Sequence, residues 1–400
     1  MRTPPLLLTA LSLALAAGPA FAQSAGVETR APNGKGQTPA FENQTRAPQP
    51  AKAVEIKAEV IAKGLPHLWA MEFLPDGRML VTAKDGEIHI VDAKGGTRAV
   101  EGVPAVASAG QGGLLDVALA PDFARSHLIY FCFSEPRDDG NGTSVASARL
   151  VEDEDGASLE ETKVIFRQMP SYSNSKHFGS RLAFGPDKML YVTVGERSDR
   201  KTRVHAQDLS SSFGKVFRID AEGKAPADNP FVGKKDAQPE IWSYGHRNMQ
   251  AAAIDGKGRL WTVEHGPKGG DELNRPEAGK NYGWPVITYG IDYSGRPIGD
   301  GITAAEGMEQ PVYYWDPVIG PSGMAFYDAD AIPEWKGAIL IGGLVAQGVV
   351  VLHMEGDRVK FEEHVPLDAR VRDVKVGPDG AVYAVTEGGD ASTIVRLSKS

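Results

Sequence analysis

The chain has 400 residues, a formal net charge of −9 at pH 7 and one cysteine, Cys132. The excess of acidic side chains argues against a surface that binds nucleic acid. A single cysteine excludes an intramolecular disulfide, and its position in the apolar run Leu128–Phe133 predicts a buried thiol rather than a nucleophile. After the N-terminal segment, no run is long and apolar enough to span a membrane, which takes about 20 residues.

The N-terminus has the pattern of a secretory signal peptide over residues 1–22. One basic residue, Arg2, precedes a Leu/Ala-rich run over Leu6–Ala17, and small residues follow at Ala20 and Ala22, where cleavage is expected. The alternative, a transmembrane anchor, is less favoured because the apolar run is short. We therefore expect an exported protein, located in the periplasm or secreted.

Residues 23–53 are rich in Pro, Gly, Ala, Gln and Asn, and Phe41 is their only aromatic residue. Such a composition buries too little apolar surface to offset the entropy of ordering, so we expect a flexible linker. Residues 54–400 are expected to form the folded domain. Their length would allow two domains, but repeat folds of this size form single units.

One phrase recurs along residues 54–400: an apolar strand, a Pro-Asp-Gly-like turn and a second apolar strand. In Met71–Thr82, for example, the turn is Pro75-Asp76-Gly77. The six copies, spaced roughly 45 to 75 residues apart, begin at Met71, Val117, Leu182, Ala253, Met324 and Val374. The fifth copy is degenerate, and Gly/Pro-rich loops fill the space between copies.

Alternating strands joined by such turns form hairpins. Self-similarity at this period, with almost no helical periodicity between copies, predicts an all-β fold, a six-bladed β-propeller of four-stranded antiparallel blades. The strand near Val54–Ile61 is expected to complete the last blade beside the C-terminal strands and so to close the ring. A β-sandwich or a two-domain all-β protein is the alternative.

Four short motifs in the second half of the chain carry residues suited to chemistry. They are His177–Leu182, Gly245–Asn248, Glu264–Asn274 and Arg370–Val374. Each lies at a strand end, just before or after an apolar alternating run, and strand ends on one rim of a sheet assembly converge on a cleft. A histidine, a loop that can hold a cation and several arginines in one cleft suit a multiply anionic, metal-bound cofactor.

In this order, the four motifs resemble those of the soluble quinoprotein sugar dehydrogenases, the glucose/sorbosone dehydrogenase family. The His-Phe-Gly-Ser-Arg-Leu motif at His177–Leu182 is similar to that of its aldose sugar dehydrogenase branch. The resemblance spans about residues 60–397 and implies a six-bladed propeller that holds pyrroloquinoline quinone (PQQ) and Ca²⁺ on one face. The implied activity is oxidation of the anomeric carbon of aldoses to lactones.

The resemblance implies catalytic roles for His177 and Arg247. His177 matches the general base, and a histidine suits the task because the hydroxyl proton must leave as hydride departs from the same carbon. Arg247 matches the arginine at the quinone oxygen, where a fixed cation stabilises the charge that develops on reduction. Asn248 would hydrogen-bond the cofactor. The alternative for His177 is a solvated loop histidine, and the alternative for Arg247 is an inter-blade salt bridge.

The resemblance also implies the metal ligands. Gly266 and Pro267 match the turn whose main-chain carbonyls bind Ca²⁺, which accepts neutral oxygen ligands in flexible geometry. Asp271 would support this site. Glu272 and Tyr282 would form a second, structural Ca²⁺ site, although carboxylates on propeller loops are more often simply solvated.

Four further residues match cofactor-binding positions of the family. Arg370 and Arg372 alternate on a strand and so face the same side, where the family binds the cofactor carboxylates. Gln111 resembles the glutamine near the substrate hydroxyl and the quinone, and its alternative is a turn residue in a Gly-rich loop. Trp315 is expected to wall the pocket, and a core position is its alternative.

The chain departs from the family pattern at two places. Glucose-oxidising members carry a lysine that meets a cofactor carboxylate in the loop that corresponds to Gly342–Gly348, and this loop has none here. His265 stands where some relatives have glutamine. The first departure bears on cofactor affinity and leaves a catalytically silent relative as an alternative.

Two other classes of function compete with a dehydrogenase. One is a Ca²⁺-dependent lactonase or other hydrolase on a propeller, which builds its site from side-chain Glu, Asn and Asp. The other is a non-catalytic binding propeller. For the dehydrogenase we expect an aldose substrate, an unidentified electron acceptor, no nucleic acid, no membrane span, and a monomer or weak dimer.

Overall fold

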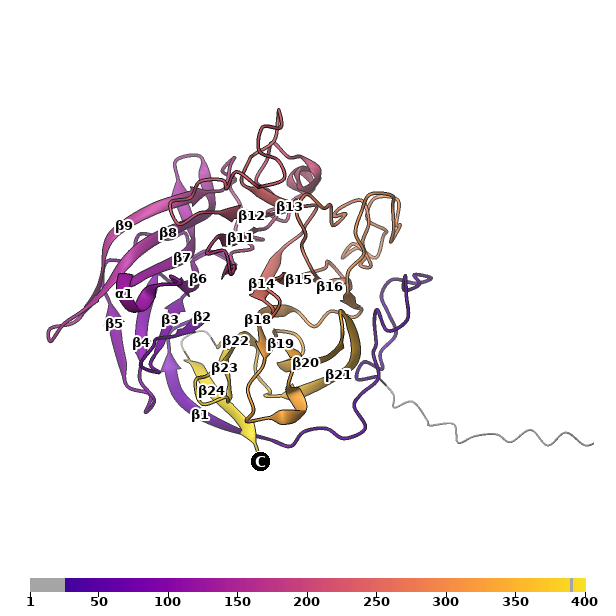
Figure 1. Cartoon of the computed structure of the whole chain (residues 1–400). Coiled ribbons are helices and arrows are strands. Elements are labelled where there is room, and N and C mark those ends of the chain that lie inside the picture. The colour runs from indigo at the N-terminus through magenta and orange to yellow at the C-terminus, as the bar shows by residue number, and fades with distance from the viewer. Residues whose placement is uncertain (1–25, 389–390) are drawn as a thin grey trace, which may run out of the picture.

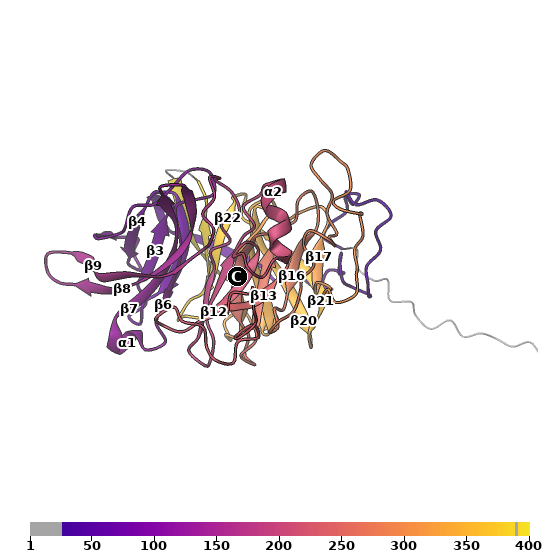
Figure 2. The ribbon, with the colours of Figure 1, turned by 90° about the horizontal axis from the view of Figure 1, so that it is seen from above.

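The computed structural model describes residues 26–388 and 391–400, which form a ring of six four-stranded antiparallel sheets (Figure 1). The predicted all-β, six-bladed propeller is therefore confirmed. Seen from the side, the blades stand next to one another in a disc (Figure 2). The predicted signal peptide, residues 1–22, lies outside the described residues.

Each of the first three blades is built from four strands that follow one another in the chain. The first blade contains β2 (Leu68–Phe73), β3 (Met79–Ala83), β4 (Glu87–Val91) and β5 (Thr97–Val100). The second contains β6 (Leu114–Leu119), β7 (Leu128–Arg137), β8 (Gly140–Glu152) and β9 (Ala157–Arg167). The third contains β10 (Leu182–Phe184), β11 (Leu190–Val194), β12 (Lys215–Ile219) and β13 (Ile241–Tyr244).

The other three blades repeat this plan, except that the sixth borrows a strand from the N-terminal side. The fourth contains β14 (Met249–Ile254), β15 (Leu260–Glu264), β16 (Asp271–Asn274) and β17 (Tyr313–Trp315). The fifth contains β18 (Pro321–Tyr327), β19 (Ala338–Gly343), β20 (Gly348–Glu355) and β21 (Arg358–Pro366). The sixth contains β22 (Val371–Val376), β23 (Val382–Thr386), β24 (Ser392–Lys399) and β1 (Ile56–Leu65).

In the part of the chain that the structure describes, helical structure is confined to single turns in the connections. These are α1 (Phe123–Ser126), α2 (Arg200–Arg203), η1 (Val204–Gln207) and η2 (Pro333–Trp335). Within residues 26–388 and 391–400, no helix has the length and apolar character needed to cross a bilayer.

The ring closes by pairing the two ends of the domain. Strand β1 pairs antiparallel with β24, from Ile56 opposite Lys399 to Leu65 opposite Ser392. The expectation that an N-terminal strand completes the last blade is confirmed. Closure in this way leaves no gap between the first and last blades and so protects the strand edges there.

The recurring phrase forms the hairpin between the first and second strand of a blade. In the first blade, Phe73 pairs with Met79 across the turn, and the Gly77 amide donates to the Leu74 carbonyl at 2.9 Å. Gly77 has φ +85°, a conformation that glycine adopts without the clash of a side chain. The first strands lie at the centre of the ring, where each contacts the first strands of both neighbouring blades.

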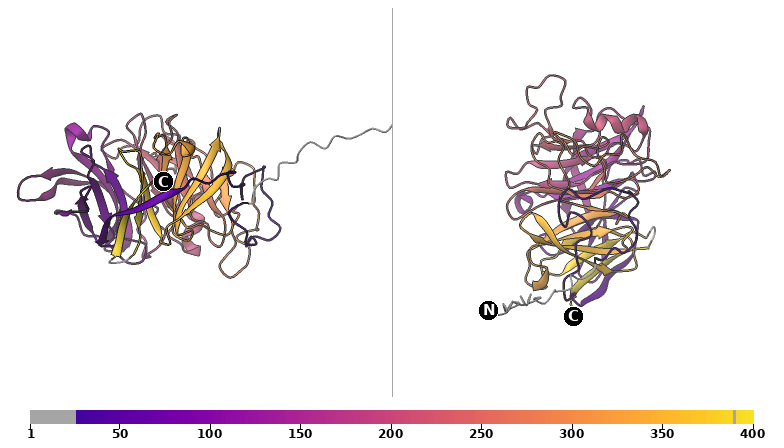
Figure 3. Two further views of the ribbon diagram at one scale, coloured as in Figure 1. Left: turned by 90° about the horizontal axis from the view of Figure 1, so that it is seen from below. Right: turned by 90° about the vertical axis from the view of Figure 1, so that its right-hand side faces the viewer.

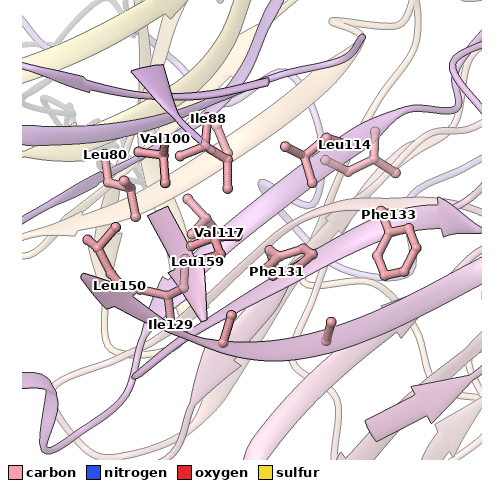
Figure 4. Packing of buried hydrophobic residues seen from close by; sticks show 14 of the residues in the cluster. Leu80, Ile88, Val100, Leu114, Val117, Ile129, Phe131, Phe133, Leu150 and Leu159 are labelled. Carbon is pink, nitrogen blue, oxygen red and sulfur yellow. The ribbon is translucent and has the colours of Figure 1, made fainter. Parts of the chain in front are cut away.

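Blades pack against each other through both faces, so their middle strands are apolar runs rather than alternating ones. Every residue of β3 is buried. The cluster between the first two blades draws residues from each (Figure 4) and includes Leu80, Ile88, Leu114, Val117, Ile129, Phe131 and Leu159. Cys132 is fully buried in the next cluster, between the second and third blades, and burial raises the pKa of its thiol, which makes it a core residue, as predicted.

The described part of the expected linker, residues 26–53, instead packs along the outer side of the fourth and fifth blades (Figures 1 and 3). The Gln44 side chain donates to the Pro311 carbonyl at 2.9 Å, and the Gln44 carbonyl accepts from the Tyr314 amide at 2.9 Å. The Ala47 amide donates to the Tyr313 hydroxyl at 2.8 Å. Polar contacts to distant strands order this segment, which its low apolar content alone would not do.

Candidate functional site

A cavity of about 390 Å³ lies at one rim of the ring. Its walls come from the starts of first strands, such as Trp69 in β2 and Arg372 in β22, and from residues that follow second strands, such as His265 and Glu387. In an antiparallel blade these two points lie at the same end of the sheet. The convergence of strand ends on one cleft, expected from the sequence, holds for the motifs Glu264–Asn274 and Arg370–Val374, whereas no residue of His177–Leu182 or Gly245–Asn248 lines the cavity.

The basic side of the cavity is built around one carboxylate. Arg372 Nη2 lies 2.9 Å from both carboxylate oxygens of Glu387, and Arg370 Nε donates to Glu387 Oε2 at 3.0 Å. His67 Nε2 lies 2.9 Å from the other oxygen. Burial opposes ionisation of Glu387, but the charge of Arg372 and these hydrogen bonds outweigh it and lower the pKa of Glu387 to about 2.

The two arginines differ in exposure and in unused hydrogen-bonding capacity. The Arg370 side chain is 48% exposed, whereas that of Arg372 is 8% exposed. Arg372 Nη1 donates to Gln250 Oε1 at 2.9 Å, and its Nε is buried without a partner in the described part of the chain. A buried guanidinium donor without an acceptor beside a cavity is suited to an anionic ligand.

His177 is oriented by a carboxylate that the sequence reasoning missed. Its Nδ1 lies 2.6 Å from Glu196 Oε1, and its backbone amide donates to Gln111 Oε1 at 2.7 Å. Nε2 has no hydrogen-bond partner among the described residues. Burial, followed by the charge of Arg247, holds the pKa of His177 well below its usual value, which keeps the imidazole neutral.

The loop that carries His177 fits closely against the residue before Glu196. A Cβ atom on Gly195 would lie 2.3 Å from the His177 carbonyl oxygen, so only glycine allows this approach. Burial raises the pKa of Glu196 to about 7, although the charges of Arg247 and Arg203 oppose the rise. His177 itself is 5% exposed and does not line the cavity; its backbone amide is bonded to Gln111, which does.

Arg247 hydrogen-bonds to the turn that is predicted to bind Ca²⁺. Its Nη1 donates to the carbonyls of His265 and Gly266 at 2.7 and 2.8 Å, and its amide donates to Glu264 Oε2 at 2.6 Å. The Gly266 amide donates to Asp271 Oδ1 at 2.8 Å. Burial raises the pKa of Asp271 to about 7, against the hydrogen bonds that this carboxylate accepts.

The predicted Ca²⁺ turn faces the cavity, with Gly266 and Pro267 among the lining residues. A Cβ on Gly266 would come within 2.3 Å of the Gly269 and Gly270 carbonyl oxygens, so the tight turn requires glycine. The Gly266 carbonyl already accepts from Arg247, whereas no described group donates to the Pro267 carbonyl. The described residues contain no cluster of three or more His, Cys, Asp or Glu side chains that could hold a metal.

The two residues of the predicted second Ca²⁺ site border one small cavity of about 10 Å³. Glu272 accepts from Asn274 Nδ2 at 3.2 Å, and burial, together with the nearby charge of Glu264, raises its pKa well above the usual value. The Tyr282 hydroxyl donates to the Arg275 carbonyl at 2.5 Å. The phenol is therefore engaged away from Glu272. Glu264 borders the same small cavity, but the described residues contain no group of three or more His, Cys, Asp or Glu side chains that could hold a metal.

Three residues predicted to bind the cofactor do not line the cavity: Arg247, which borders a second, small cavity, Trp315 and Asn248. Trp315 is 4% exposed, lies in the core between the fourth and fifth blades, and donates its indole N–H to Glu362 Oε1 at 3.0 Å. Asn248 is 1% exposed, and its Oδ1 accepts from the Gly179 amide at 3.0 Å. Trp315 thus lies in the core, which was the alternative considered for it. Asn248 holds the loop that follows His177.

Several cavity-lining residues were not predicted because they lie outside the four motifs. They are Trp69, Lys84, Gln250, Tyr293 and Glu387, and Glu196 supports the site from behind. Lys84 and Glu387 directly follow a second strand of their blades, as Glu196 nearly does. Inspection of the first two positions after the second strand of every blade, rather than of motifs, would have found all three.

Comparisons with known proteins show which family this chain belongs to. The family model described as glucose/sorbosone dehydrogenase matches residues 65–396. Aldose sugar dehydrogenase YliI of Escherichia coli is 44% identical over 344 residues, which cover 84% of this chain and 91% of that protein.

Solved structures give the same result. The apo-form of the soluble aldose sugar dehydrogenase from Escherichia coli superposes with a TM-score of 0.81 at 42% identity, over 86% of this chain and 100% of that one. The PQQ-bound form of aldose sugar dehydrogenase from Streptomyces coelicolor superposes with a TM-score of 0.70 at 30% identity, over 87% and 100% of the two chains.

Proposed function

The chain belongs to the glucose/sorbosone dehydrogenase family, and from this premise we propose that it is a PQQ-dependent aldose dehydrogenase. The proposed reaction oxidises the anomeric carbon of an aldose to the lactone. The observation that carries the proposal is the pairing of His177 with Glu196 behind a cavity whose wall holds Arg370 and Arg372. One wall can bind an anionic cofactor, and the adjacent imidazole can accept a proton.

The cavity fits PQQ in size and charge. Its volume lies within the range of about 300–1,000 Å³ that is typical of small-molecule sites. PQQ carries carboxylates, and the unpartnered Nε of Arg372 and the half-exposed guanidinium of Arg370 are donors suited to them. When bound there, PQQ would take up the hydride from the anomeric carbon, and Ca²⁺ would polarise the carbonyl that receives it.

The protein's part in this reaction is to accept the hydroxyl proton. With Glu196 ionised, Nδ1–H of His177 donates to the carboxylate, so the lone pair of the ring lies on Nε2. Nε2 is then the atom that takes the proton of the anomeric hydroxyl, and Glu196 stabilises the imidazolium that results. Gln111, bonded to the His177 amide and exposed to the cavity, is placed to orient the substrate hydroxyl.

Ca²⁺ would be held by the main-chain carbonyls of Gly266 and Pro267 at the cavity wall. Because Arg247 donates to the Gly266 carbonyl, that oxygen would have to be shared between the guanidinium and the metal. Further oxygen ligands would come from the cofactor. Arg247 stays fixed through its second bond to the His265 carbonyl, near the developing negative charge that it is proposed to stabilise.

We also propose that the protein is exported, on the evidence of the N-terminal pattern over residues 1–22. Electrons would then pass to an acceptor outside the cytoplasm.

The alternative, a Ca²⁺-dependent lactonase, has less support. The described part of the chain contains no cluster of three or more Glu, Asp, His or Cys side chains that could hold its metal.

Reconstitution tests the proposal. Purified apo-protein is titrated with PQQ in the presence of Ca²⁺, and a panel of aldoses is offered with an artificial electron acceptor. The proposal expects saturable binding and aldose-dependent reduction of the acceptor. Tight binding of PQQ with no reduction by any aldose would leave a binding propeller, and hydrolysis of a lactone would identify a hydrolase.

A further inference from the structure

Lys84 occupies the end of the second strand in the first blade, at the rim where the cavity lies. Its backbone is fixed between two blades, because its amide donates to the His67 carbonyl at 2.8 Å and its carbonyl accepts from the Leu114 amide at 3.0 Å. A Cβ on Gly113 would lie 2.1 Å from the Lys84 carbonyl oxygen. The close approach of the second blade therefore fixes the position of the Lys84 main chain at the cavity.

The Lys84 ammonium is buried and forms no direct ion pair within the described part of the chain. The residue is 8% exposed, and its Nζ donates to the Gly110 carbonyl at 2.6 Å. No carboxylate of residues 26–388 or 391–400 lies within ion-pairing distance of it. An ammonium has three N–H donors, and this one lines the cavity. A buried cation without an opposite charge is costly unless a ligand supplies one.

The distribution of charge around the cavity points to the missing partner. Arg370 and Arg372 share the single carboxylate of Glu387. Burial and the charge of Arg372 lower the pKa of Lys84, against the charges of Glu387 and Asp85, so Lys84 lies within electrostatic reach of the arginines and of the one carboxylate that they share. The loop after β19 contributes only the apolar Leu344 and Val345 to the wall. The cationic groups of the cavity thus come from the first and sixth blades.

We propose that Lys84 binds a carboxylate of PQQ, as a third cation beside Arg370 and Arg372, and so supplies from the first blade the positive charge that the loop Gly342–Gly348 lacks. This assignment rests on the proposed function of the cavity. The ligand that satisfies these positions is an anion with carboxylates on more than one side, rather than a neutral sugar.

The test is a titration of apo-protein with PQQ in the presence of Ca²⁺, followed by calorimetry, on wild type, Lys84→Met and Lys84→Arg. A charge-assisted hydrogen bond is worth about 1.5–3 kcal/mol, so the Kd of Lys84→Met should rise about 10- to 100-fold. Lys84→Arg keeps the charge and should lose less affinity. Lys94→Met, which removes an exposed lysine of the same blade, should leave the Kd unchanged.

A second ligand distinguishes a loss of charge at Lys84 from a general disturbance of the fold. The trimethyl ester of PQQ lacks the carboxylate charges, so wild type and Lys84→Met should bind it with the same Kd. Thermal unfolding of apo Lys84→Met should match or exceed wild type, because the variant loses a buried, unpaired cation. Equal Kd values of wild type and Lys84→Met for PQQ itself would overturn the assignment. Failure of wild type to bind PQQ would overturn the proposed function and this assignment with it.

Discussion

The Nδ1 atom of His177 lies 2.6 Å from Oε1 of Glu196, and both side chains are almost completely buried. The pair is formed by the loop before β10 and the residues after β11, two segments that meet at the rim because β10 and β11 are antiparallel. Glu196 Oε2 has no partner among the described residues. The carboxylate therefore has one principal task, which is to fix the orientation and tautomer of the imidazole.

Replacement of His177 by alanine should remove the proton acceptor and leave the cofactor wall intact. We expect turnover to fall by about 10²–10⁴-fold, the usual contribution of a positioned general base. The Kd for PQQ should change little, because the cationic groups that line the cavity lie elsewhere. Stopped-flow reduction at saturating PQQ checks this. A variant that loses PQQ but reduces it at the normal rate once saturated would make His177 a binding residue.

Glu196 should give the reaction a pH dependence. Burial raises its pKa to about 7, so the carboxylate is protonated below this pH and ionised above it. Only the ionised form accepts from Nδ1–H and leaves Nε2 free, so kcat should rise with pH through about 7. In Glu196→Gln this rise should disappear and kcat should fall at least about tenfold. An unchanged pH profile in Glu196→Gln would assign the transition to another group.

The two arginines beside Glu387 should contribute unequally to cofactor affinity. Arg372→Lys keeps the charge but loses the planar fork in a buried setting, so we expect the Kd for PQQ to rise about tenfold or more. Arg370→Lys should have a smaller effect because its side chain is half exposed to solvent. Both variants should keep their turnover at saturating PQQ. A normal Kd with lost turnover in Arg372→Lys would contradict this role.

The segment of residues 26–53 should stabilise the propeller rather than tether it loosely. Gln44→Ala removes the side-chain hydrogen bond to the Pro311 carbonyl and leaves that buried group unsatisfied, at a cost of about 1–3 kcal/mol. The melting temperature of the apo-protein should fall accordingly. Glu42→Ala, at an exposed neighbouring position, is the control and should melt like wild type. Equal melting of Gln44→Ala and wild type would show that the segment does not contribute to stability.

The fold could be read from the sequence because the same hairpin phrase occurs once per blade, and Pro75-Asp76-Gly77 specifies its turn locally. The packing of residues 26–53 could not, because it depends on contacts such as that of Gln44 with the Pro311 carbonyl, 267 residues away. A composition rule that weighs apolar content alone cannot detect such polar contacts.

The site was predictable where several of its residues share a motif, as Arg370 and Arg372 do. It was not where single residues meet from separate blades. Lys84, Glu196 and Glu387 are ordinary charged residues at strand ends, and only the ring brings them together. Trp315 is the opposite case, a residue that was expected at the pocket and instead lies in the core. There the buried carboxylate of Glu362 accepts its indole N–H.

The most direct test of the account is a single-turnover experiment with the reconstituted protein. PQQ and Ca²⁺ are bound to the apo-protein, oxygen and other acceptors are removed, and an aldose is mixed in while the absorption of the bound cofactor is followed. We predict rapid conversion to the spectrum of the reduced cofactor in wild type, and loss of this conversion after Ca²⁺ is chelated or in His177→Ala. An unchanged spectrum of fully bound PQQ with every aldose tested would contradict it.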